Sequence, residues 1–182
     1  MVKAAPCIAL VVFVAAGVAA QQSAEQNEFW KSLRALCGNA YGGKIIETAP
    51  YAKESLGRRE VIHVRECADD AVRIMYQPYL GRARTWVISQ NAQGLRFRHH
   101  DRWVDMGDSG VTQYGGSTRS RGTATRQEFP ADEETGARFA EIKALTWIVE
   151  ITPGRTFAYT VRRKGASGSF RVEFDLSKPN PQ

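Results

Sequence analysis

Apolar and polar residues alternate along most of the chain that follows residue 40. The alternation is clearest at residues 156–163 and 169–176, where aromatic and branched apolar side chains take every second position. A period of two is typical of a strand with one face in a core and the other in solvent. The pattern predicts ten strands, at residues 40–48, 60–67, 71–77, 83–90, 95–101, 111–117, 123–129, 146–152, 156–163 and 169–176.

Two segments depart from this period and predict helices. Residues 28–37 place Phe29 and Leu33 at helical spacing and are followed by Gly38, which favours the end of a helix. Residues 132–144 begin with Asp132, a favourable N-cap residue, and continue with acidic residues that suit a first helical turn. We therefore expect one short N-terminal helix and one short helix late in the chain.

The connections between the predicted strands are short and rich in Gly, Pro, Asn and Asp, as in hairpin turns. Strands joined in this way predict a mainly β fold, an antiparallel meander of about ten strands. We expect the meander to close into a barrel rather than a sandwich, because no strand is an obviously protected edge. At the level of architecture, such a barrel is similar to the lipocalins and the fatty-acid-binding barrels.

The first twenty residues have the composition of a secretory signal peptide. Lys3 precedes a short apolar run, and small residues lead to a cleavage site near Ala20. The polar residues 21–27 are expected to be disordered, residues 28–176 to form the single domain, and residues 177–182 to form a tail. The chain is therefore expected to be secreted or periplasmic, with no transmembrane segment.

Three cysteines are present, and Cys7 would be lost with the signal peptide. Cys37 and Cys67 remain as an even pair in a chain sent to an oxidising compartment, which predicts a disulfide between them. The alternative, two free thiols in a catalytic or metal-binding role, has no CxxC spacing in its favour.

The formal net charge is +6, and the excess is local. Residues 81–126 contain eight arginines and three acidic residues. Because arginine suits carboxylate, phosphate and sulfate groups, Arg96, Arg98 and Arg102 predict an anion-binding surface for acidic polysaccharides or lipid head groups. The alternative is that these charges only keep edge strands soluble. A secreted protein of modest charge is not expected to bind nucleic acid.

Several polar residues are expected inside the barrel. His99 shares strand parity with Leu95 and Phe97, so it should face inward. His63 and Arg65 share parity with Cys67 and would face inward if that cysteine does; the opposite face of the strand is the open alternative. The pattern predicts a pocket for a small ligand that is partly apolar or anionic, with five ligand-binding residues: His63, Arg65, Trp86, His99 and Trp147.

A second hypothesis is a hydrolase that uses His99 with nearby carboxylates. Asp101, Asp105 and Asp108 follow His99 and could provide acid–base chemistry or metal ligands. His100 points to the opposite face of the strand and cannot share a metal with His99. No nucleophile and no haem-binding motif accompany these residues, so we expect no metal and no cofactor, and we favour binding over catalysis.

Some short motifs in the chain are distinctive as sequence marks. They are LCGNAYGGK at residues 36–44, HVREC at 63–67, RTWV at 84–87, YGG at 114–116, FPADEET at 129–135 and FDL at 174–176. On these motifs the chain resembles a family of secreted bacterial proteins without an assigned function, over nearly all of its length after the signal peptide. The resemblance implies no activity and no catalytic residue. Relatives have a His-Asp-His-Arg-His stretch where this chain has RHHDRW at residues 98–103.

Overall fold

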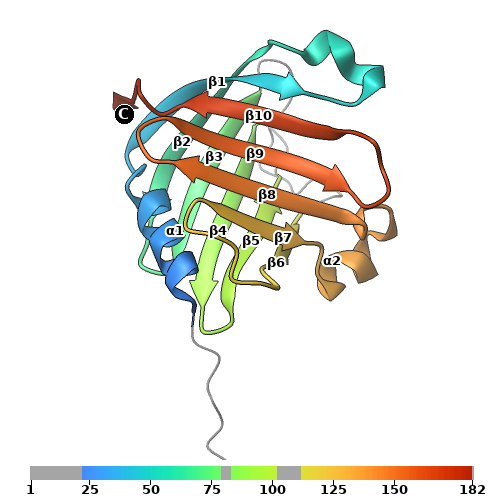
Figure 1. Ribbon diagram of the computed structural model, residues 1–182, viewed down its shortest axis with the longest axis horizontal. Helices are drawn as coiled ribbons and strands as arrows, with labels where there is room; N and C mark the ends of the chain where they lie inside the picture. Colours follow the sequence, from blue (N-terminus) through green and yellow to red (C-terminus); the bar gives the residue numbers. More distant parts are fainter. Residues whose placement is uncertain (1–21, 79–82, 102–111, 182) are drawn as a thin grey trace, which may run out of the picture.

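Ten antiparallel strands form a nearly closed barrel in the computed structural model, which describes residues 22–78, 83–101 and 112–181 (Figure 1). The strands are β1 (Asn39–Glu47), β2 (Arg59–Cys67), β3 (Ala71–Pro78), β4 (Arg84–Asn91), β5 (Gly94–His100), β6 (Tyr114–Ser117), β7 (Arg126–Pro130), β8 (Leu145–Thr152), β9 (Thr156–Arg163) and β10 (Ser169–Asp175). The helical segments are α1 (Ala24–Arg34), η1 (Pro50–Ser55), α2 (Glu133–Arg138) and η2 (Ala140–Ile142). The predicted mainly β barrel is confirmed.

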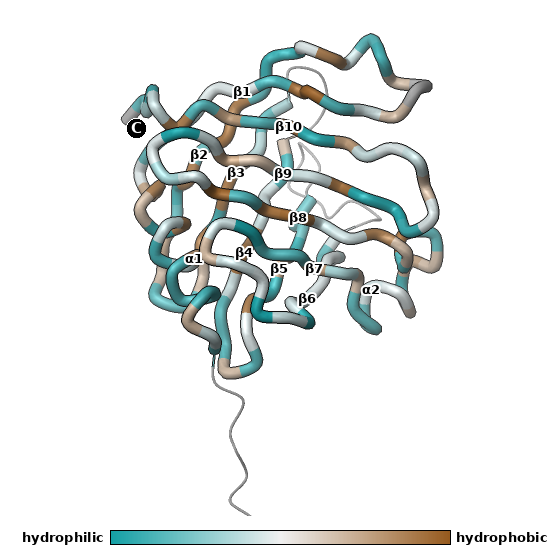
Figure 2. Tube along the Cα trace, viewed as in Figure 1, coloured by the Kyte–Doolittle hydropathy of each residue, from teal (hydrophilic) through white to brown (hydrophobic). Residues whose placement is uncertain are grey.

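The strands follow one another around the barrel in sequence order. The hydrogen-bonded order is β6-β5-β4-β3-β2-β1-β10-β9-β8-β7, so that β1 and β10 pair and the interruption lies between β6 and β7. Alternation places Phe157 and Tyr159 of β9 and Val172 and Phe174 of β10 in the core. Hydrophobic and hydrophilic positions therefore alternate along the same strands in Figure 2.

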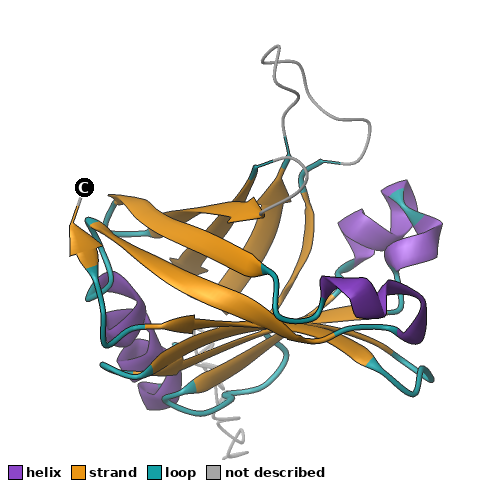
Figure 3. Cartoon of the chain, turned by 90° about the horizontal axis from the view of Figure 1, so that it is seen from above, coloured by secondary structure: helices purple, strands orange, loops and turns teal. Residues whose placement is uncertain are grey.

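Helix α1 covers one end of the barrel, and α2 and η1 lie at the other (Figure 3). Helix α1 begins four residues before the predicted start, because Ser23 and Gln26 form a reciprocal capping box. The spacing of the hydrophobic residues does not contain this signal. The face of α1 that packs on the barrel carries Phe29, Trp30 and Leu33, which are buried. The expectation of disorder up to residue 27 is therefore wrong for the residues from Ala24 onward.

The C-terminal tail also differs from expectation. Asn180 and Pro181 form a two-residue strand, β11 (Asn180–Pro181), that pairs with Ala40 and Asn39 at the start of β1. The described pairing of β1 with β10 begins only at Gly43, so the first residues of β1 have room for another partner on that side. The tail takes this place although it contains prolines, which have no backbone N–H to donate to a neighbouring strand.

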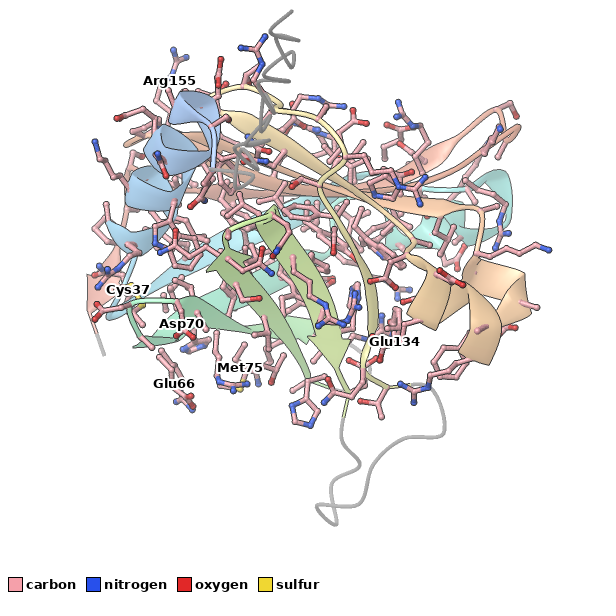
Figure 4. All side chains as sticks on the ribbon, turned by 90° about the horizontal axis from the view of Figure 1, so that it is seen from below. Cys37, Glu66, Asp70, Met75, Glu134 and Arg155 are labelled. Atoms are coloured by element: carbon pink, nitrogen blue, oxygen red, sulfur yellow. A yellow bond between two sulfur atoms is a disulfide. The ribbon has the colours of Figure 1, made fainter. Side chains whose placement is uncertain are left out.

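The predicted disulfide between Cys37 and Cys67 is present. It joins the segment after α1 to the end of β2, at the end of the barrel that α1 covers (Figure 4, in which Cys37 is labelled). The bond therefore ties the helix to the sheet in addition to the apolar contacts beneath it.

Gly116 allows the barrel to close between β6 and β7. The two strands meet at a single bridge, from Gly116 to Ala131, and a Cβ atom on Gly116 would overlap the carbonyl oxygen of Pro130. Beside it, the Thr135 hydroxyl contacts both backbone groups of Gly115, the nitrogen and the oxygen, at 2.8 Å each. The first turn of α2 thus replaces part of the missing strand ladder. We name this junction, formed by residues 114–117 and 129–135, the seam.

Replacing both cysteines with serine is expected to lower the free energy of unfolding by roughly 3 to 4 kcal/mol, the entropy of a closed loop of this length. Urea denaturation at neutral pH would measure the loss. The oxidised parent chain and the parent chain under a reducing agent are the references. Equal stability of the serine variant and the oxidised parent would contradict the prediction.

Replacing Gly116 with Ala is expected to destabilise the barrel by about 1 to 3 kcal/mol, because the added methyl group forces the seam apart. Gly42→Ala is the matched control: its Cβ meets no atom within 4 Å, and a change of less than about 0.5 kcal/mol is expected. Chemical denaturation of the two variants measures the difference. Similar stabilities would show that the close approach at Gly116 is not needed for closure.

Candidate functional site

A cavity of about 370 Å³ opens at the end of the barrel opposite α1. Its lining comes from the end of β1, the start of β2, the end of β3, the start of β4, the end of β9 and the start of β10, which an antiparallel barrel brings to the same rim. The lining residues are Ile45, Ser55, Arg58, Glu60, Tyr76, Pro78, Arg84, Trp86, Tyr159, Val161 and Phe170.

Stacked aromatic rings form one wall of this cavity. The Trp86 ring lies between Tyr76 and Tyr159, with ring-centroid distances of 4.7 and 4.2 Å and interplanar angles of 15° and 19°. Stacked pairs of this kind stabilise by about 0.5 to 1.5 kcal/mol beyond the area they bury. The wall is therefore held in place before any ligand arrives. Trp86 is one of the predicted ligand-binding residues, and its contact with a ligand stays a prediction.

The rest of the cavity combines apolar and charged side chains. Ile45, Val161 and Phe170 provide an apolar surface, while Arg58 and Arg84 bring two guanidinium groups to the same space. Glu60 is also in the lining and is only 3% exposed. A molecule inside would meet apolar surface, two guanidinium groups and the buried Glu60 side chain.

A polar cluster lies behind the stacked rings. The Nε2 atom of His99 is 2.8 Å from the Tyr159 hydroxyl, and the His99 ring stacks on Tyr114 at 4.4 Å. The Tyr114 hydroxyl donates to Asp101 at 3.4 Å, and Arg84 lies 3.9 Å from the same carboxylate. The inward position that strand parity predicts for His99 is confirmed, since the residue is 1% exposed.

Burial decides the protonation of this cluster. It lowers the pKa of His99 to about 3, and the positive charge of Arg84 acts in the same direction. Burial also raises the pKa of Asp101, and it raises the pKa values of Tyr114 and Tyr159 above the ordinary phenol value. The histidine and the phenols are therefore neutral at physiological pH. The charge of Arg84 opposes the rise at Asp101 and at both phenols, so Arg84 makes this region favourable for anions.

Of the two faces left open for this strand, the structure has the one that turns His63 and Arg65 away from the interior, so the prediction that they bind a ligand inside the barrel is wrong. Ile62 and Val64 face the core, His63 is half-buried on the other face and Arg65 is exposed. The register of β2 against β3 shifts between Val64 and Glu66, which is a β-bulge. A bulge reverses strand parity, so the position of Cys67 carries no information about the face of His63.

Trp147 is buried, but it is not among the residues that line the cavity. Its ring packs against His99 and Tyr114, at centroid distances of 5.4 and 5.8 Å. The residue therefore supports the polar cluster from behind and contributes no cavity surface.

Two of the three arginines predicted to bind anions form ion pairs with carboxylates of the chain itself. Arg98 is 8% exposed and contacts Asp132 and Glu134, and Arg96 lies 2.6 Å from Glu134. Burial opposes the ionisation of Asp132, but hydrogen bonds from Arg98 and Thr135 hold its pKa below the ordinary value. An external anion would have to break these pairs. Arg102 lies outside the described residues.

The proposed hydrolase residues are only partly described. Tyr114 lies between His99 and Asp101, stacking on the first and donating to the second, and Asp105 and Asp108 lie outside the described residues. Within the described ranges, no group of three His, Cys, Asp or Glu side chains is arranged to hold a metal ion. Catalysis by His99 stays a prediction.

The sequence reasoning named only Trp86 among the eleven lining residues. For four of the ten that it missed, strand parity contains the signal. Glu60 shares parity with Ile62, Tyr76 with Ile74, and Tyr159 with Phe157. Arg84 follows the same rule, two residues before Trp86. Each would have been found by asking which polar residues share a face with the predicted core.

Comparison with models of protein families and with curated protein sequences gave no match. None of the described helices is both long and apolar enough to cross a membrane. The function is therefore argued from the cavity and the side chains around it.

Acid is expected to destabilise the fold through His99. The unfolded chain takes up a proton near pH 6.5, whereas buried His99 resists protonation down to about pH 3. Between these values the unfolded state binds the extra proton, so stability falls as the pH falls, by up to about 1.4 kcal/mol per pH unit for this one group. The raised pKa of Asp101 acts in the opposite direction, so the contribution of His99 must be read from a variant.

His99→Gln is expected to flatten the dependence of the unfolding free energy on pH between about pH 6.5 and 4. Tyr159→Phe is the control, because it removes the hydroxyl partner of His99 but leaves the histidine buried; it should lose stability and keep the slope. Urea denaturation at several pH values measures both. An unchanged slope in His99→Gln would show that the histidine is protonated as readily in the folded chain as in the unfolded chain.

Proposed function

We propose that this protein binds a small amphipathic anion inside the barrel. The apolar part of the ligand packs against Ile45, Val161 and Phe170, and its anionic group pairs with Arg84, with Arg58 as a second cation. The observation that carries the proposal is the presence of an apolar wall and two guanidinium groups in one cavity. Its volume, about 370 Å³, lies within the range of about 300 to 1,000 Å³ that is usual for small-molecule sites.

The state of Arg84 supports this proposal. Its guanidinium is half-exposed, and its distance of 3.9 Å from Asp101 is at the long end for an ion pair. The Asp101 side chain, by contrast, is only 16% exposed, so solvent reaches the pair from the Arg84 side. An incoming carboxylate or sulfonate can therefore approach the exposed side of the Arg84 guanidinium.

The stacked wall favours the same function. Tyr76, Trp86 and Tyr159 are held by one another, so their side chains have little freedom left to lose when a ligand binds. The phenols of Tyr76 and Tyr159 are neutral, so they bring no charge that would repel an anion. We place this binding outside the cytoplasm, with which the disulfide is compatible.

A pair of fluorescent probes tests the proposal. The probe 1-anilinonaphthalene-8-sulfonate combines an apolar ring system with a sulfonate, and N-phenyl-1-naphthylamine has the same rings without the charge. Arg84→Gln is expected to weaken binding of the sulfonate roughly 10- to 100-fold, the worth of one charge-assisted hydrogen bond. The same variant should leave the neutral probe nearly unaffected.

Arg65→Gln is the matched control, because Arg65 is exposed on the outer face of β2. It should bind both probes as the parent chain does. Equal affinities of Arg84→Gln and the parent for the sulfonate, with both chains folded by circular dichroism, would refute the role of Arg84. Equal weakening in Arg84→Gln and Arg65→Gln would mean that the probe responds to net charge and not to the cavity.

A further inference from the structure

A second hollow, of about 770 Å³, lies along β1 between β2 and β10. Most of its lining side chains belong to the outward-facing positions of these three strands, and Glu60 is the one lining residue that it shares with the cavity inside the barrel. Gly42 opens its floor, since a Cβ there would meet no atom within 4 Å. The neighbouring positions carry side chains of modest size: Val61 of β2 lies opposite Gly42, and Thr156 of β9 lies opposite Asp175. We call this hollow the outer groove; the residues used below are Gly42, Lys44, Arg59, Arg155, Glu173 and Asp175.

Two cations face each other across the outer groove. Lys44 of β1 and Arg59 of β2 are directly opposite in the strand register. Like charges in such a position repel and destabilise an antiparallel pair. Neither side chain forms an ion pair with a residue in the described ranges, and both are exposed.

The acidic residues of the outer groove are already engaged. Lys44 is also opposite Glu173 of β10, but Glu173 accepts a hydrogen bond from Arg171 at 2.9 Å. Asp175 accepts hydrogen bonds from Ser177 and lies 3.7 Å from Lys178. The third carboxylate of the lining, Glu60, is only 3% exposed and lies on the inward face of β2. Lys44, Arg59 and Arg155 therefore remain as three exposed cations of the outer groove that form no ion pair with a carboxylate in the described ranges.

This surface differs from the arginine-rich segment in its chemistry. Arg96, Arg98 and Arg126 of that segment are each paired with a carboxylate of the chain. The positive charge of the outer groove, by contrast, is open to solvent.

We propose that the outer groove binds an acidic polysaccharide, with its carboxylates on Lys44, Arg59 and Arg155 and its hydroxyls on Thr156, Glu173 and Asp175. An extended peptide is disfavoured because β1 is already paired with β2 and β10 along the groove, which leaves no strand edge to extend. A single-stranded nucleic acid is disfavoured because the only aromatic ring in the lining, that of Phe174, is buried and cannot stack on a base.

Binding to polygalacturonate oligomers, measured by isothermal titration calorimetry at several NaCl concentrations, tests this proposal. The parent chain should bind these oligomers, with an affinity that falls as salt rises, and should not bind neutral dextran. The double variant Lys44→Gln/Arg59→Gln is expected to bind about 2- to 30-fold more weakly, the range for two exposed ion pairs. Its salt dependence should also be shallower.

Two controls separate the outer groove from net charge. Arg65→Gln/Lys164→Gln removes two exposed cations elsewhere and should bind as the parent does. Gly42→Gln keeps every charge but fills the floor of the outer groove, and it should also weaken binding. Binding of anilinonaphthalene sulfonate should be unchanged in all these variants, so that a failure here is distinct from a failure of the interior site.

Three results would overturn the proposal. The first is equal weakening by the two double variants, which would indicate a diffuse charge effect. The second is full binding by Gly42→Gln. The third is a salt-sensitive dimer in analytical ultracentrifugation that is lost in Lys44→Gln/Arg59→Gln, which would identify a second copy of the chain as the occupant.

Discussion

The barrel depends on the close backbone contact at the seam. β6 is four residues long and meets β7 through one bridge, so a regular ladder cannot hold the two edges together. The absence of a side chain at Gly116 lets the two edges approach. The Thr135 hydroxyl and the pairs of Arg98 with Asp132 and Glu134 complete the junction. Closure at this point brings β5 opposite β9, which is the condition for the contact between His99 and Tyr159.

The seam also gives a physical meaning to two of the distinctive sequence motifs. YGG at residues 114–116 and FPADEET at 129–135 are its two sides, and Asp132 serves at once as the N-cap of α2 and the partner of Arg98. RTWV at residues 84–87, in contrast, brings Arg84 and Trp86 to the cavity. These three motifs are therefore divided between the closure of the fold and the candidate ligand site.

Strand parity was a sound guide wherever the strands are regular. It predicted the ten strands and the buried position of His99, and applied to polar residues it would also have found Glu60 and Tyr159. It left both faces of β2 open, because a bulge after Val64 reverses the parity that Cys67 would set, and no local residue type indicates that bulge. It also missed the start of α1, where the deciding signal is the hydrogen-bonding pair of Ser23 and Gln26 and not an apolar residue.

The sequence by itself determined the strands, the two helices and the cysteine pair, because alternation, capping residues and a residue count are local properties. Only the tertiary structure decided which charges are free. Arg96 and Arg98 lie more than thirty positions before the carboxylates of the acidic turn at residues 132–134. The seam brings them together, so the charges of these arginines are neutralised by the acidic residues of the turn. Lys44 and Arg59, which are unremarkable in the sequence, become neighbours because strand pairing places them opposite each other, and neither forms an ion pair with a carboxylate in the part of the chain that the structure describes.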